Sequence, residues 1–169
     1  MGRAVKALIA LVVAGMLALS GCSGQNPNIA ATVDGVAIPV TEAEETYTAL
    51  KTYLQNPSLA AATGLLVTSR VGASIAQQQG LQFSDDDRAA ASASTLPQEL
   101  AADQNLSGFV NDYVTTVLVS QQLGQEAFLA AAAAVEVEVN PRFGSWDAAT
   151  LQLEPGSGSL SSPAPATAG

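Results

Sequence analysis

The sequence lacks histidine and contains a single cysteine, Cys22, among its 169 residues. Without histidine it cannot carry out Ser-His-Asp or Cys-His catalysis, bind a metal through imidazole, or shuttle protons on imidazole near neutral pH. One cysteine can form neither an internal disulfide nor a thiolate zinc site. We therefore assign no catalytic residue, cofactor or metal ligand, and expect that the protein is not an enzyme.

Basic residues are also scarce. Six Lys and Arg stand against 15 Asp and Glu, for a net charge of −9. Binding to nucleic acid requires many Lys and Arg side chains to neutralise the phosphates, and this chain has too few of them. Nucleic acid is therefore excluded as a partner. Hydrophobic residues make up 48% of the chain, but many are alanines and many others lie in the first twenty positions. The remainder is enough for one domain of modest size.

The first 21 residues have the pattern of a bacterial lipoprotein signal peptide. Arg3 and Lys6 precede an uncharged stretch of 13 residues, 7–19. That stretch is shorter than the roughly 20 apolar residues that a membrane-spanning helix needs. The sequence Leu19-Ser20-Gly21-Cys22 resembles the lipobox of bacterial lipoproteins. The resemblance implies cleavage before Cys22, a diacylglycerol thioether on Cys22, and anchoring on the extracytoplasmic face of the cell membrane.

Two further segments are expected to lie outside the folded domain. Residues 22–28 form a short polar tether, and residues 154–169 are a Gly-, Ser-, Pro- and Ala-rich tail that we expect to be disordered. The expected domain covers residues 29–153. After cleavage the chain keeps 15 acidic and four basic residues, a net charge of −11. An anionic membrane surface should therefore repel the domain rather than bind it.

Strands are expected at both ends of the domain. Asp34-Gly35 suits a type I′ turn and lies between the apolar segments 29–33 and 36–40, which predicts a β-hairpin. Residues 135–139 alternate Val and Glu, a pattern typical of a strand covered on one face. Because a lone strand leaves its backbone unpaired, we expect 135–139 to join the hairpin in a small sheet. The expected fold class is therefore mainly α with this one small sheet.

The residues between these strands predict a series of helices. A capping box of Thr41 and Glu44 should begin the first, and Asn56-Pro57 should end it. The broadest apolar stripe lies over 106–123, which we expect to be the central core helix. The expected helices cover 41–55, 58–79, a short segment from Ser84, another from Leu96-Pro97, 106–123 and 125–134.

Two motifs are assigned to helix starts rather than to ligands. Asp85, Asp86 and Asp87 are consecutive, whereas a calcium loop alternates its ligands and needs further oxygens downstream. We interpret them as acids that complement the positive end of a helix. The sequon Asn105-Leu106-Ser107 is interpreted in the same way, as helix-start chemistry instead of a glycosylation site.

Taken together, the lipobox, the Val33-Asp34-Gly35 hairpin, the helices and the segment Asn140-Pro-Arg-Phe-Gly-Ser-Trp-Asp147 resemble the SurA N-terminal-domain lipoproteins of high-GC Gram-positive bacteria. These are relatives of the chaperone domains in PrsA- and SurA-type extracytoplasmic foldases. The resemblance spans residues 29–147 and implies a helical chaperone-type domain. A parvulin prolyl-isomerase domain is often inserted or appended in that family. This chain has neither the room nor the histidines for one, which implies a chaperone-like domain without the isomerase.

Three functions follow as hypotheses. The first is a lipid-anchored extracytoplasmic chaperone-like protein that binds non-native secreted polypeptides without catalysis. The second is an envelope scaffold or adaptor that docks one folded partner, and the third, less favoured, is prolyl isomerisation. Phe143 and Trp146 could form a client-binding platform, or could fold back and cap the core. Arg142 could pair with Glu136 or Glu138 rather than with a ligand.

Overall fold

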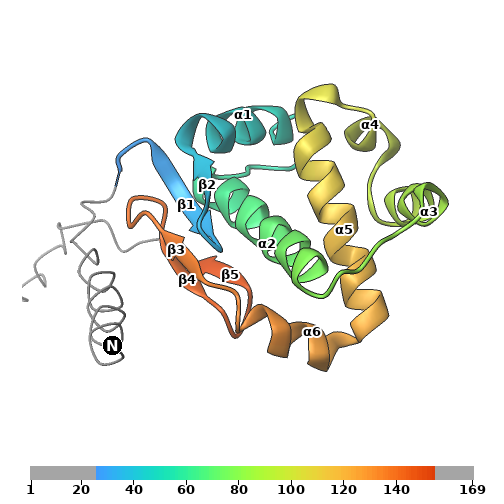
Figure 1. Ribbon diagram of the computed structural model, residues 1–169. Coiled ribbons are helices and arrows are strands. Elements are labelled where there is room, and N and C mark those ends of the chain that lie inside the picture. The colour runs from blue at the N-terminus through green and yellow to red at the C-terminus, as the bar shows by residue number, and fades with distance from the viewer. Residues whose placement is uncertain (1–25, 155–169) are drawn as a thin grey trace, which may run out of the picture.

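A computed structural model describes residues 26–154, which form a mainly helical fold with two small sheets (Figure 1). The predicted signal peptide, Cys22 and the tail residues 155–169 lie outside the described residues. The elements are β1 (Ile29–Val33), β2 (Val36–Pro39), α1 (Val40–Leu50), α2 (Leu59–Gln78), α3 (Asp85–Thr95), α4 (Gln98–Ala101), the 3₁₀ helix η2 (Gln104–Leu106), α5 (Ser107–Leu123), α6 (Gln125–Ala132), β3 (Val137–Val139), β4 (Ser145–Asp147) and β5 (Gln152–Glu154).

The first sheet joins the two ends of the domain, as the sequence predicted. Its strand order is β2-β1-β3, and β1 pairs antiparallel with both neighbours. Asp34 and Gly35 have φ values of 48° and 76°, which a type I′ turn requires at both central positions. The third strand is shorter than expected, because only residues 137–139 pair with β1, while Val135 is buried in the core.

Asp34 ties this turn to its surroundings. One carboxylate oxygen accepts the backbone N–H of Glu136 at 3.0 Å. The other accepts Gln78 Nε2 at 2.7 Å and the hydroxyl of Ser74, both on α2. The hydrogen bond from Ser74 contributes most to lowering the pKa of the Asp34 carboxyl. Burial opposes it, and the weaker contributions of Glu136 and Gln78 help to keep the pKa below its usual value. The charged carboxylate of Asp34 therefore links the hairpin to α2 and to Glu136, the residue before β3.

Asp34→Asn should weaken the fold in a pH-dependent way. Asparagine tolerates the positive φ, so the turn should persist while the charge is lost. We expect a loss on the order of 1 kcal/mol at neutral pH, kept small because the group is exposed to water. Because folding lowers the pKa of Asp34, its carboxylate stabilises the fold at pH values above 3.8, the pKa of the group in the unfolded chain. This stabilisation is lost as the pH falls through the pKa of Asp34 in the folded protein. Urea unfolding at several pH values should thus show the two proteins converging in acid. A constant difference, or one shared by the exposed control Glu126→Gln, would contradict this role.

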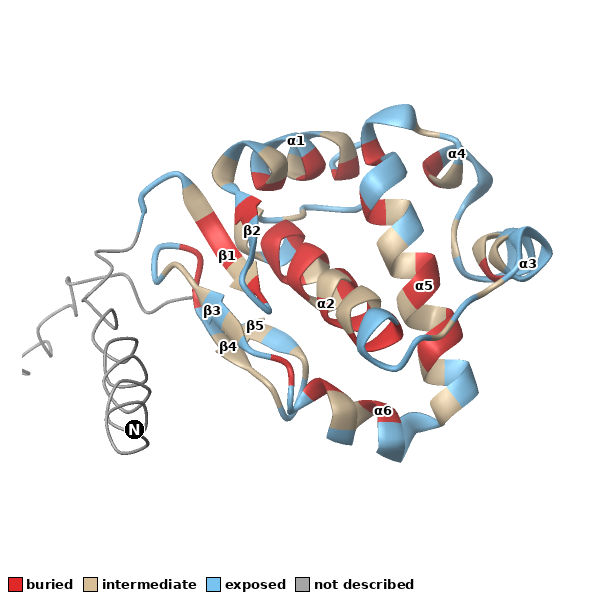
Figure 2. Cartoon of the chain, in the orientation of Figure 1, coloured by how far each residue is buried: buried red, intermediate tan, exposed pale blue. Residues whose placement is uncertain are grey.

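The central helix is α2, not the expected helix over 106–123. Figure 2 shows buried residues around much of α2, between α1, α5 and the sheet. Leu66, Val67 and Val71 are among its fully buried side chains. Gly64 and Gly72 let neighbouring elements approach closely, an effect that counting large apolar residues overlooks. Within residues 26–154, α2 alone has the length and apolar composition of a membrane-crossing helix, and more than half of its apolar window is buried within the domain.

Two helix starts differ in their outcome. The predicted Thr41–Glu44 capping box is wrong: α1 begins at Val40, after Pro39, with no side-chain cap. The sheet leads directly into this helix, and Val40 N–H donates to the carbonyl of Asn28 at 2.8 Å. The helix also ends earlier than expected, at Leu50. At α3, Ser84 and Asp87 form a reciprocal capping box, which confirms the helix-start interpretation of the acidic run.

The second sheet was not predicted. In it β4 pairs antiparallel with β5, and Trp146 lies opposite Leu153. Leu153 packs against Gly64 of α2, so the sheet covers one side of the central helix. Strands of three residues are too short to show an alternating pattern, and the turn between them includes Leu151 at a φ of 54°, a conformation unusual for leucine.

Candidate functional site

The two aromatic residues proposed for client binding lie against the core. Phe143 is only 7% exposed and belongs to the main hydrophobic cluster, while Trp146 is half-buried and packs on that cluster. The indole Nε1 of Trp146 is buried and has no hydrogen-bond partner within residues 26–154. The rings therefore do not form an exposed platform. Cys22, the predicted lipidation site, lies outside the described residues.

Arg142 does not pair with Glu136 or Glu138. Its guanidinium donates to the carbonyl of Pro27 at 2.5 Å and lies over the ring of Phe143, with 5.6 Å between the guanidinium carbon and the ring centre. The two ion pairs in the described part of the chain are instead formed by Arg70. Arg142 thus links Pro27, which precedes β1, to the segment that follows β3.

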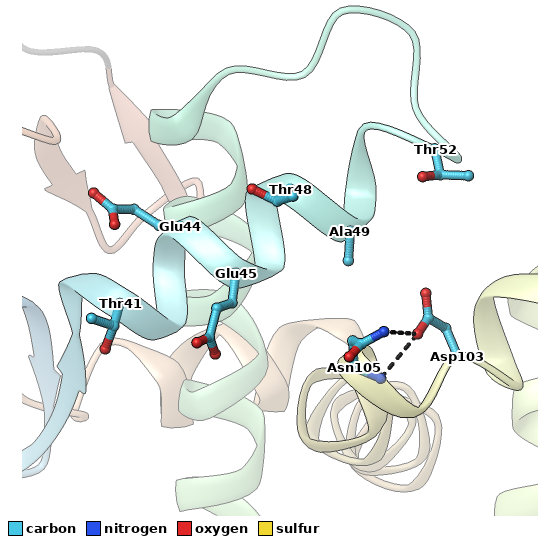
Figure 3. Close-up of a pocket in the computed structure, with 8 residues that line it drawn as sticks. All are labelled: Thr41, Glu44, Glu45, Thr48, Ala49, Thr52, Asp103 and Asn105. Atoms are coloured by element: carbon cyan, nitrogen blue, oxygen red, sulfur yellow. Dashed lines mark hydrogen bonds between the residues drawn. The ribbon is translucent and has the colours of Figure 1, made fainter.

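A groove of about 700 Å³ runs along the outer side of α1. Figure 3 shows Asp103 and Asn105 across from this helix, on the segment that includes η2. Between Thr41 and Thr52 the groove extends about 16 Å, from the helical rise of about 1.5 Å per residue. Its lining residues are Thr41, Glu44, Glu45, Thr48, Ala49, Thr52, Asp103 and Asn105.

Three carboxylates and several hydroxyls give this groove its chemistry. Asp103 is held in place: one of its oxygens accepts the backbone and side-chain N–H groups of Asn105 at 2.9 and 3.0 Å. Its other oxygen accepts the hydroxyl of Tyr53 at 3.2 Å. Desolvation of the phenol, reinforced by this hydrogen bond and by the charge of Asp103, raises the pKa of Tyr53. Glu44 and Glu45 are exposed and form no ion pair within residues 26–154.

An apolar recess of about 260 Å³ adjoins the groove at the start of α1. Val40 and Glu44 contribute from α1, and Leu59 and Ala60 from the start of α2. The recess is completed by Arg142 and Phe143. Glu44 lines both the recess and the groove, and Figure 3 shows its side chain on the opposite side of α1 from that of Glu45. Glu44 is therefore the one residue that lines both hollows, which lie on either side of α1.

A third hollow, between the hairpin turn and α2, contains Arg70, whose charge is already balanced. Arg70 bonds Glu42 of α1 at 2.8 Å and Asp112 of α5 at 3.2 Å. Burial acts to lower the pKa of Arg70, but the hydrogen bond to Glu42 and the charge of Asp112 outweigh it and raise that pKa. Burial also raises the pKa of Asp112, although the charge of Arg70 opposes this. These ion pairs join three helices and balance the charge of Arg70, the cation that lines this hollow.

Within residues 26–154, no group of three acidic, cysteine or histidine side chains lies close enough together to hold a metal. What the grooves offer is shape, hydrogen bonding and negative charge. Comparison with protein-family models, with curated proteins and with solved structures found no match for this chain.

Sequence reasoning missed Glu45, Thr48 and Asp103 as groove residues. Glu44 was named, but only as a helix cap. One local signal was available, since Thr41, Glu45, Thr48 and Thr52 recur at helical spacing as a polar face without a cation. The opposite wall could not be found in this way, because Asp103 is separated from that face by the whole of α2, α3 and α4.

Proposed function

We propose that this protein is a lipid-anchored extracytoplasmic chaperone-like protein that binds non-native polypeptides without catalysis. The observation that carries the proposal is the open groove along α1. Its length of about 16 Å suits roughly five residues of extended chain, at about 3.3 Å per residue. Threonine hydroxyls, carboxylates and the Asn105 amide can bond the backbone N–H groups of such a segment, whatever its sequence.

Anchoring and location rest on the N-terminal sequence. The lipobox ending at Cys22 supports attachment to the outer face of the cell membrane, where secreted chains emerge unfolded. The resemblance to SurA N-terminal-domain lipoproteins supports the same assignment. An acidic domain held away from an anionic surface would keep its groove open to the surrounding medium.

An adaptor that docks one folded partner is the alternative. Stable interfaces of that kind have a contiguous apolar centre. Within residues 26–154 the large apolar side chains that are well exposed are Val36, at 59%, and Leu54, at 41%. Val36 lies on β2 and Leu54 follows α1, so they do not offer one broad apolar patch by themselves. This favours contact with short extended segments over contact with a folded surface.

The test is the aggregation of a chemically unfolded client diluted into buffer with the purified full chain. We expect slower growth of light scattering, in proportion to the amount of chain added. Thr48→Trp, at an exposed groove position, should abolish the effect by filling the groove. The matched control Gln121→Trp, exposed on α5, should retain it. Unchanged aggregation at a large excess of the wild-type chain, or equal activity of both tryptophan variants, would contradict the proposal.

A further inference from the structure

We infer that the surface along α1 selects extended segments that combine one large apolar side chain with a nearby lysine or arginine. The inference rests on the proposed function and names the class of client. It uses the two hollows that share Glu44 as a lining residue: the apolar recess and the acidic groove.

The recess has the size and lining for one apolar side chain. Val40, Leu59, Ala60 and Phe143 provide apolar walls around about 260 Å³. The recess is open to solvent on its outer side, and its volume is enough to take one leucine or phenylalanine side chain against these walls. Its small size favours a single anchoring residue over a continuous apolar contact.

The neighbouring groove complements a cation. Glu44, Glu45 and Asp103 line it, and no described basic residue lines it with them. Arg142 lies at the recess instead, where its guanidinium already contacts Pro27 and the ring of Phe143. With 15 acids and four bases outside the signal segment, the domain as a whole attracts cationic segments and repels acidic ones.

The arrangement also fixes a spacing. Measured along the axis of α1, Glu45 lies about 7 Å beyond Val40, and Thr52, in the turn that follows the helix, lies about 18 Å beyond it, from a rise of about 1.5 Å per residue. An apolar side chain seated in the recess would therefore place the groove beside client residues roughly two to five positions away, at about 3.3 Å each. A lysine or arginine in that window can reach Glu44, Glu45 or Asp103.

Fluorescence anisotropy with labelled Gly/Ser-based peptides tests this with the purified full chain. One peptide carries leucine and lysine about three residues apart, within the window derived from the strand rise. The others carry leucine alone, lysine alone, or leucine with glutamate. We expect the leucine–lysine peptide to bind at least about tenfold more tightly than each of the others, and to weaken as salt is added. Equal binding of the leucine–glutamate peptide would overturn the inference.

Variants separate the two hollows. Ala60→Phe fills the recess and should reduce the affinity for the leucine–lysine peptide to that for lysine alone. Glu44→Gln combined with Glu45→Gln should reduce the affinity for the leucine–lysine peptide to the affinity for leucine alone. Glu126→Gln, exposed on α6, should leave the affinity unchanged.

If Ala60→Phe fails to fold, the peptide series still decides. If no peptide binds but the chain still slows aggregation, this inference fails and the proposed function stands; if aggregation is also unaffected, both fail.

Discussion

Gly72→Ala is expected to destabilise the fold by about 3 kcal/mol, at the upper end of the usual cost of overpacking. A Cβ at this position would lie 2.0 Å from Oγ1 and 2.5 Å from Cβ of Thr116 on α5. Thr116 cannot turn aside freely, because its hydroxyl bonds the carbonyls of Ser69 and Asp112 at 3.0 and 2.8 Å. The added methyl group must therefore push α2 and α5 apart. Urea unfolding measures the loss.

Two further variants test the cause of this loss. Gly108→Ala also replaces a helical glycine, but nothing lies within 4 Å of its added Cβ, so it should be neutral or slightly stabilising. Thr116→Gly removes all three atoms that the new Cβ would meet, and should recover part of the stability of Gly72→Ala. If Gly72→Ala were as stable as the wild-type protein, the close contact of α2 with α5 would be wrong.

Gly144→Ala should cost a similar amount, again about 3 kcal/mol, from an unfavourable φ and a steric overlap together. Gly144 has a φ of 139°, and an added Cβ would lie 2.1 Å from the carbonyl oxygen of Glu154. That oxygen belongs to β5, so the substitution should separate β5 from β4. Trp146 is the only tryptophan and lies in β4 opposite Leu153. Its fluorescence should therefore shift to the red as the second sheet opens.

Gly35→Ala is the matched control for backbone strain alone. Gly35 also has a positive φ, of 76°, but nothing lies within 4 Å of its added Cβ. It should cost about 1 kcal/mol and leave the tryptophan emission unchanged. Wild-type emission and stability in Gly144→Ala would show that the second sheet does not close as described.

The features of the fold that could be predicted are those with local patterns. The Asp34-Gly35 turn and the alternating residues near Val137 each specify a strand from a few neighbouring residues, and the need for backbone pairing then brings them together. The expected helix over 58–79 agrees with α2. In the structure the hydroxyl of Ser58 caps its start by accepting the N–H of Ala61, and Gly80 follows its end at a φ of 64°.

The features that could not be predicted depend on contacts between distant segments. The central place of α2 depends on Gly72 facing Thr116, and the second sheet depends on Leu153 packing against Gly64. Neither contact leaves a periodic signal in the sequence. The start of α1 was mispredicted for a different reason: Thr41 and Glu44 have the residue types of a capping box, but the helix already begins at Val40.

The candidate site divides in the same way. The polar face of α1 is visible as helical spacing, but its opposite wall at Asp103 comes from a distant segment. Phe143 was singled out as either core or client-binding. The structure buries it in the main cluster while leaving part of it on the wall of the apolar recess. Burial and a role in binding are therefore compatible at this residue.

The central claim is that the groove along α1 receives many different non-native chains. The most direct test places a photo-crosslinking amino acid at Thr48, in the groove, in the full chain expressed in its native cells, with Gln121 on α5 as the control position. We predict a broad set of crosslinked secreted polypeptides from position 48 and few from position 121. One dominant folded partner at position 48, or the same products from both positions, would contradict the proposal.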